Sequence, residues 1–222
     1  MTALLRYHTA LLLRSQRWLA PVLLHAAFLA VGVQSAQPVL DALGYAAAGL
    51  LPVAAWFVHL GAGLEPPAAR TVVAAAVGTP RAHLASLLAG FGCAGALGAV
   101  TTVIVLLISD PASTDRTVPV PLLSAGIAGL LAAACCALLG GAIGALCTRP
   151  VLHRRGWSVA ATVLAALLCL VTTGSPANSA VTGLVTGSRT GAVQLPVLPL
   201  VLAAVSAAAV TALVCRLAAV RG

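Results

Sequence analysis

The sequence predicts an all-α integral membrane protein with six transmembrane helices, and three observations support this prediction. Of the 222 residues, 61% are hydrophobic and only 7% are charged, whereas a soluble domain carries about a quarter charged residues to cover its surface. Apolar stretches close to the roughly 20 residues that cross a bilayer as a helix recur along the whole chain. The basic residues stand between these stretches. We therefore treat residues 1–222 as a single transmembrane domain.

The first segment, residues 3–17, is predicted to be a helix that lies on the membrane surface. An apolar and a basic stripe run along it at three- and four-residue spacing, although the separation is imperfect. Its three basic residues are Arg6, Arg14 and Arg17. Because arginine stems let the guanidinium reach anionic headgroups, we expect these three to anchor the helix to the membrane. The alternative is that the segment is only the start of the first span.

Six apolar segments follow, and the distribution of arginine gives their orientation. The predicted spans cover about residues 18–34, 42–63, 83–108, 120–147, 157–174 and 195–216. With the N-terminus inside, the cytoplasmic segments hold Arg6, Arg14, Arg17, Arg70, Arg81, Arg149, Arg154, Arg155, Arg216 and Arg221, and only Arg116 and Arg189 lie outside. Cytoplasmic loops of membrane proteins are enriched in basic residues. Both termini are therefore expected in the cytoplasm, in a multi-pass protein of the cell membrane.

The cytoplasmic connection between the second and third spans is predicted to contain a short helix, at about residues 67–77. Glu65 stands before two prolines, which suit the first turn of a helix, and an acid there is favourable to the helix dipole. Gly78 and Pro80 mark its end. We expect this helix to lie outside the membrane.

The connection between the fifth and sixth spans, residues 175–194, is too apolar for an ordinary solvated loop and too short and polar to span the membrane. A partly re-entrant or surface-lying segment is one interpretation, since irregular backbone inside a membrane must be covered by protein. Disorder is the other.

The composition argues against several kinds of chemistry. All twelve basic residues are arginine, so the chain has neither the lysine of a P-loop ATPase nor a Schiff-base lysine. Its four acidic residues are scattered, and neither a metalloprotease motif nor a metal-ligand cluster is present. The arginines do not form the single patch that binds nucleic acid. The six cysteines are interpreted as small buried side chains. We therefore expect no catalytic residue, no bound metal and no nucleic-acid partner.

Polar groups inside the spans are candidates for lining a transport path. His25 and His59 are the ionisable side chains of the predicted spans, and such groups are functional candidates in a membrane. The hydroxyls of Thr101, Thr172 and Thr173 add a mildly polar lining. This lining suits an amphipathic or lipid-like substrate. The plainer interpretation is that each histidine is neutral and hydrogen-bonded within the bundle.

Two segments carry a resemblance to a known family. They are RYHTALLLRSQRW at residues 6–18 and LEPPAARTVVAAAVGTPRAHL at residues 64–84. A surface helix before six spans, and a short cytoplasmic helix between the second and third, resemble the permease subunits of six-span ABC exporters. In that family the first segment is an elbow helix and the second holds the coupling helix. Arginine in place of every lysine, with abundant alanine and glycine, is typical of a high-GC bacterium.

The resemblance implies an indirect mechanism. A separate cytoplasmic ABC ATPase would hold ATP and Mg²⁺, this chain would hold no cofactor, and a second permease subunit, the same chain or another, would complete the path. Docking of the ATPase is expected at Glu65, Arg70, Thr71 and Arg81. Alternatively, Arg70 and Arg81 only fix the topology. One rival hypothesis is a six-span substrate-binding subunit, which would lack the coupling helix. Another is a membrane scaffold or accessory subunit.

Overall fold

The computed structural model describes residues 1–148 and 155–221, and within these ranges the fold consists of nine helices without a β-strand. The helices are α1 (Thr2–Arg14), α2 (Leu19–Gly32), α3 (Val39–Gly63), α4 (Pro67–Val77), α5 (Thr79–Ile108), α6 (Leu122–Leu146), α7 (Arg155–Val171), α8 (Pro176–Thr190) and α9 (Val197–Arg221). The all-helical prediction is confirmed.

The helices long and apolar enough to cross a membrane are α3, α5, α6 and α9 in the described ranges. Helices α7 and α8 together give a fifth candidate, bent by 47° at the break between them. Helix α2 has 14 residues, fewer than the roughly 20 of a full span. These helices suggest a multi-pass membrane protein. The count of six spans stays a prediction, because α2 is short and the predicted fifth span is broken.

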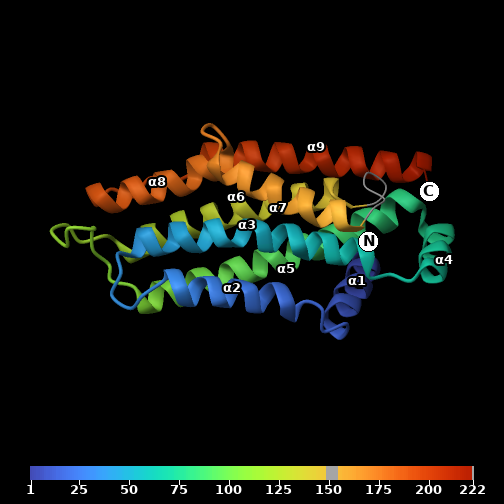
Figure 1. Ribbon diagram of the computed structural model, residues 1–222, viewed down its shortest axis with the longest axis horizontal. Coiled ribbons are helices and arrows are strands. Elements are labelled where there is room, and N and C mark those ends of the chain that lie inside the picture. Colours follow the sequence, from blue (N-terminus) through green and yellow to red (C-terminus); the bar gives the residue numbers. More distant parts are fainter. Residues whose placement is uncertain (149–154, 222) are drawn as a thin grey trace.

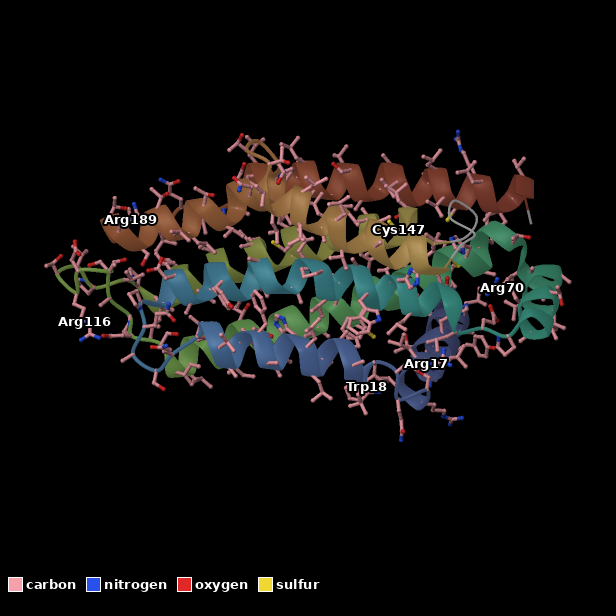
Figure 2. All side chains as sticks on the ribbon, viewed as in Figure 1. Arg17, Trp18, Arg70, Arg116, Cys147 and Arg189 are labelled. Atoms are coloured by element: carbon pink, nitrogen blue, oxygen red, sulfur yellow. The ribbon has the colours of Figure 1, made fainter. Side chains whose placement is uncertain are left out.

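The long helices lie side by side, and different connections and short helices lie at the two ends of the bundle (Figure 1). Both chain termini, α1 and α4 lie at one end, which we call the basic end. The opposite end holds residues 33–38, residues 109–121 and the C-terminus of α8; we call it the distal end. Figure 2 shows Arg17 and Arg70 at the basic end and Arg116 and Arg189 at the distal end. Arg116 and Arg189 therefore lie at the opposite end from Arg17 and Arg70, as predicted, while Arg149 and Arg154 lie outside the described residues.

The centre of the bundle is the contact between α3 and α6. A Cβ added at Gly140 would overlap the carbonyl oxygen of Leu51, and one at Gly144 would overlap that of Ala55. The backbones approach so closely because these two positions carry no side chain, as in other close-packed membrane helices. Most of the neighbouring α3 side chains are fully buried. This contact positions the other helices.

The structure corrects two predicted boundaries, the start of the third span and the end of the fifth. The helix expected at 67–77 is present as α4, but α5 begins at Thr79 rather than residue 83, so that Gly78 alone separates the two helices. Gly78 has a φ of +88°, which glycine adopts readily. Helix α7 ends at Val171 instead of 174, since Pro176 lacks an N–H and disfavours a helical residue before it.

The segment for which re-entrance and disorder were alternatives is an ordered helix, α8. The Ser175 hydroxyl accepts a hydrogen bond from the Asn178 N–H at 3.1 Å, the usual arrangement of a helix N-cap. The Asn178 amide donates to the Leu170 carbonyl at 2.7 Å and so joins α8 to the end of α7. Helix α8 packs on α3, α6 and α9. It belongs to the bundle and continues the course of α7 toward the distal end (Figure 1).

Candidate functional site

Helix α4 lies outside the bundle at the basic end, crossing the direction of the long helices (Figure 1). Arg70 and Thr71 on α4 and Arg81 on the first turn of α5 are all exposed. The Arg70 guanidinium donates to the backbone carbonyl of Glu65 at 3.2 Å. The Thr71 hydroxyl donates to the carbonyl of Ala68 at 2.8 Å within its own helix. Arg70 therefore fixes the entry to α4, and most of its outer surface stays open.

Glu65 is the one glutamate of the chain. Its side chain lies beneath this entry and is only 7% exposed. Tyr7 and His8 of α1 face it, and His83 of α5 lies beside His8 and Arg70. We call these five residues the Glu65 cluster. They join α1, the α3–α4 connection, α4 and α5 at one point. A buried carboxylate needs such partners, because burial without them disfavours its charged form.

Several atoms of the Glu65 cluster lack a hydrogen-bond partner among the described residues. They are Oε1 of Glu65, Nε2 of His8 and Nε2 of His83, all buried. Burial lowers the pKa of His8, and the charge of Glu65 raises it in part. Burial, followed by the charge of Glu65 and a hydrogen bond to it, raises the pKa of Tyr7. His8 therefore favours its neutral form, and the packing of α1 here depends on charge.

Sequence reasoning identified Glu65 and Arg70 but missed the other members of the cluster. The expected apolar stripe of α1 is not its buried face, because that face carries His8, 4% exposed, and Leu12, 1% exposed, whereas Tyr7 is exposed. The spacing of His8 and Leu12 was the available signal, since residues four apart share one helix face. A single glutamate beside a helix boundary also indicates that a polar or charged side chain should lie near it.

The three arginines expected to anchor α1 are all exposed. Arg6 lies in the first half of α1, Arg14 is its last residue, and Arg17 lies in the turn to α2. Figure 2 shows Arg17 next to Trp18 at the margin of the bundle. This position is compatible with contact to lipid headgroups, which stays a prediction.

The candidate path-lining residues are not gathered in one place in the described part of the chain. His25 and Thr101 do meet: Nε2 of His25 lies 3.1 Å from the Thr101 hydroxyl, and both side chains are buried. The void beside this pair leaves no room for a water molecule. His59 is half-buried on α3. Thr172 and Thr173 are exposed at the break between α7 and α8, and Thr172 donates to the carbonyl of Leu168.

Metal-ligating side chains do not converge in residues 1–148 and 155–221: no three histidine, cysteine, aspartate or glutamate residues there could hold an ion. The six cysteines are unbonded to one another, and three are buried. No protein-family model, curated protein or solved structure matches the chain. The fold thus places the chain in the class of α-helical membrane proteins with several apolar helices. The function is inferred from the helices and side chains at the basic end.

Proposed function

We propose that this chain is the membrane-spanning permease subunit of an ATP-driven ABC exporter. The observation that supports it best is α4, an 11-residue helix that stands outside the bundle between two long apolar helices. It lies at the end where the arginines are concentrated, which is the side expected to face the cytoplasm. A separate ATPase would dock on α4, and a second permease subunit would complete the path.

The connections of α4 suit a part that transmits movement. Gly78 alone separates α4 from α5, and three residues, 64–66, separate it from α3. Arg70 ties its first turn to the backbone of Glu65, whose side chain contacts α1. A displacement of α4 would therefore be transmitted to α1, α3 and α5, because the connections between them are short. Closure of the ATPase could in this way shift the bundle between two arrangements, which requires different contacts in each.

The proposal includes six spans with both termini in the cytoplasm. Helix α2 supplies the first span together with the residues that flank it, and α7 with α8 supplies a broken fifth span. Both termini lie at the same end as α4 (Figure 1), as an even number of crossings requires. ATP and Mg²⁺ are bound by the partner ATPase, and this chain contributes the path and the docking surface.

The docking surface on α4 consists of exposed side chains, with Glu65 beneath it as an internal joint. Arg70 and Thr71 project from its first turns, and Val72 is 69% exposed. The core of a protein interface is apolar and arginine is enriched at interfaces, and Val72 and Arg70 supply one side chain of each kind. Arg81 extends the surface onto α5. The lining of the path stays a proposal for His25, His59, Thr101, Thr172 and Thr173.

The first experiment is gentle purification of the tagged full-length chain from its own host, with mass spectrometry of the proteins that accompany it. We expect a stoichiometric P-loop ATPase. Val72→Asp and Arg70→Glu should each reduce its retention by about tenfold, because a buried mismatched charge costs at least about 1.4 kcal/mol.

The matched control is Arg189→Glu, the same charge reversal on an exposed residue of the distal end. It should leave the ATPase bound. A pure preparation without any ATPase, under conditions that keep known transporters intact, would overturn the proposal and favour a substrate-binding or accessory subunit. Equal losses from Arg189→Glu and Val72→Asp would show that α4 is not the docking surface.

A further inference from the structure

We propose that the turn between α1 and α2 binds one anionic phospholipid, whose phosphate is held by Arg14 and Arg17. An open hollow of about 420 Å³ lies at this turn and is lined by Leu11, Arg14, Ser15, Arg17 and Leu64. Two guanidinium groups and two leucines thus border one space. Guanidinium groups bind phosphate oxygens through paired hydrogen bonds, which a single lysine does not provide.

The turn itself leaves both guanidinium groups available. The last carbonyls of α1 already accept hydrogen bonds from the Ser15 N–H at 3.1 Å, the Ser15 hydroxyl at 2.7 Å and the Trp18 indole N–H at 3.0 Å. The backbone N–H of Arg17 donates to the Ser15 hydroxyl at 3.3 Å. The helix end is therefore capped without Arg14, whose side chain is exposed.

In residues 1–148 and 155–221, no carboxylate is paired with these arginines. Three of its four acidic residues, all aspartates, lie at or next to the distal end, and the fourth, Glu65, is buried against Tyr7. Two cations that share a hollow without an acid repel each other, and a bound phosphate removes that repulsion. The hollow therefore favours an anion.

The surroundings indicate that the anion carries an apolar tail. Leu11 and Leu64 line the hollow. Leu19 and Leu23 follow Arg17 in the sequence, in the first turns of α2, and are 41% and 66% exposed. Because they are four residues apart on one helix, they share one face. This face is a track for an acyl chain that begins at the headgroup. Trp18 stands between Arg17 and Leu19 in the sequence. Tryptophan is enriched at membrane interfaces.

Binding of one lipid in this hollow can be distinguished from general electrostatic attraction between arginines and an anionic membrane. In that case Arg6 would contribute as much as Arg14, since each exposed cation near the surface adds about 1 kcal/mol. Arg6 does not line the hollow, and it lies about 12 Å from Arg14 along the helix axis. The proposal therefore predicts different contributions to lipid binding from Arg6 and Arg14, although both lie on α1. It depends on membrane insertion of the chain and is independent of its role in transport.

The test is native mass spectrometry of the full chain, released from nanodiscs of phosphatidylcholine with a minority of phosphatidylglycerol. The wild type should keep one phosphatidylglycerol in preference to phosphatidylcholine. The pair Arg14→Gln and Arg17→Gln should lower that retention by about tenfold, and Arg6→Gln should leave it unchanged. Gel filtration and circular dichroism identify the folded variants. If the glutamine pair misfolds, Arg14→Lys with Arg17→Lys, which keeps the charge but not the paired hydrogen bonds, should lower retention by about threefold.

Each other outcome overturns the proposal. Equal loss in Arg6→Gln indicates diffuse electrostatic attraction, and unchanged retention in both pairs places the lipid elsewhere. Displacement of the lipid by inorganic phosphate at millimolar concentration identifies a site for a soluble anion. Retention of the partner ATPase is measured on the same variants and should not change, so failure of this inference is distinguishable from failure of the transport proposal.

Discussion

At the distal end, connections far apart in the sequence are joined mainly through the backbone, with added side-chain bonds from Thr114 to Asp41 and from Arg116 to the Ala36 carbonyl. At the basic end the helices meet through side chains. The Asp110 N–H donates to the carbonyl of Gln37 at 2.9 Å, and the Asp110 carbonyl accepts from the Val39 N–H at 3.0 Å. The Thr114 N–H donates to the carbonyl of Ser188 on α8 at 2.9 Å. These bonds connect three segments by groups that carry no charge.

The basic end has the opposite character. Helix α1 reaches the bundle through His8 and Leu12, and the Glu65 cluster includes buried polar atoms without a partner. Uncharged backbone hydrogen bonds persist when charges change. The packing of the buried His8 imidazole, in contrast, depends on whether the ring is protonated. The comparison teaches that the distal end is built to hold its shape and the basic end to respond. Two substitutions and a change of pH test it, in order of decreasing effect.

The largest effect is expected at the centre, which both ends share. Gly140→Val would drive a branched side chain into the backbone of α3 at Leu51, and we expect a loss of about 3 kcal/mol in stability. Thermal unfolding in detergent measures it. Hydrogen exchange should show that both ends lose protection together.

The matched control is Gly95→Val on α5, because no heavy atom lies within 4 Å of the position its Cβ would take. It should change the unfolding temperature little. If the two substitutions were equally tolerated, the contact between α3 and α6 would not be the element on which both ends depend.

An intermediate effect is expected from pH at the basic end. Burial lowers the pKa of His8, while a free histidine titrates near 6.5. As the pH falls below that value, undocked α1 binds a proton that docked α1 excludes. Docking should therefore weaken, by up to about tenfold per pH unit, until the lowered pKa is reached. Hydrogen exchange between pH of about 7.5 and about 5.5 should show α1 losing protection, with residues 109–121 unchanged.

Two variants control this pH effect. His8→Gln removes the titrating group and should abolish the acid sensitivity of α1. Glu65→Gln removes the charge that raises the pKa of His8, so acid sensitivity should extend to lower pH. Loss of protection in α1 that persisted in His8→Gln would assign the sensitivity to a different group.

The sequence predicted most helices but not the faces by which they pack. Apolar runs locate α3, α5, α6 and α9, and prolines with Gly78 delimit α4. Both α5 and α6 carry glycines and alanines at four-residue spacing, yet a Cβ at Gly140 would overlap the α3 backbone, whereas a Cβ at Gly95 would meet no heavy atom within 4 Å. Helices that are apolar on every side give no periodic signal of which face is inside. Packing decides it.

The candidate site shows the same limit. Glu65 and Arg70 stood out because charges are scarce, and their place beside a helix start is local in sequence. His8 and His83 join them only because α1 folds back across the start of α5, a contact between segments about 75 residues apart in the sequence. The break at Ser175, in contrast, was predictable from Pro176.

The smallest effect is expected at the distal end. Ser188→Ala removes the contact of 3.1 Å between the hydroxyls of Ser188 and Thr114 but keeps the backbone bond between the same residues, so we expect a loss of about 1 kcal/mol or less. Ser206→Ala is the control, since that exposed hydroxyl bonds only within α9. Hydrogen exchange of residues 109–121 compares them. If Ser188→Ala opened the distal end as widely as acid opens the basic end, side chains would hold both ends and the distinction between them would fail. A small local change would instead leave the backbone bonds as the reason that the distal end keeps its shape when the pH changes.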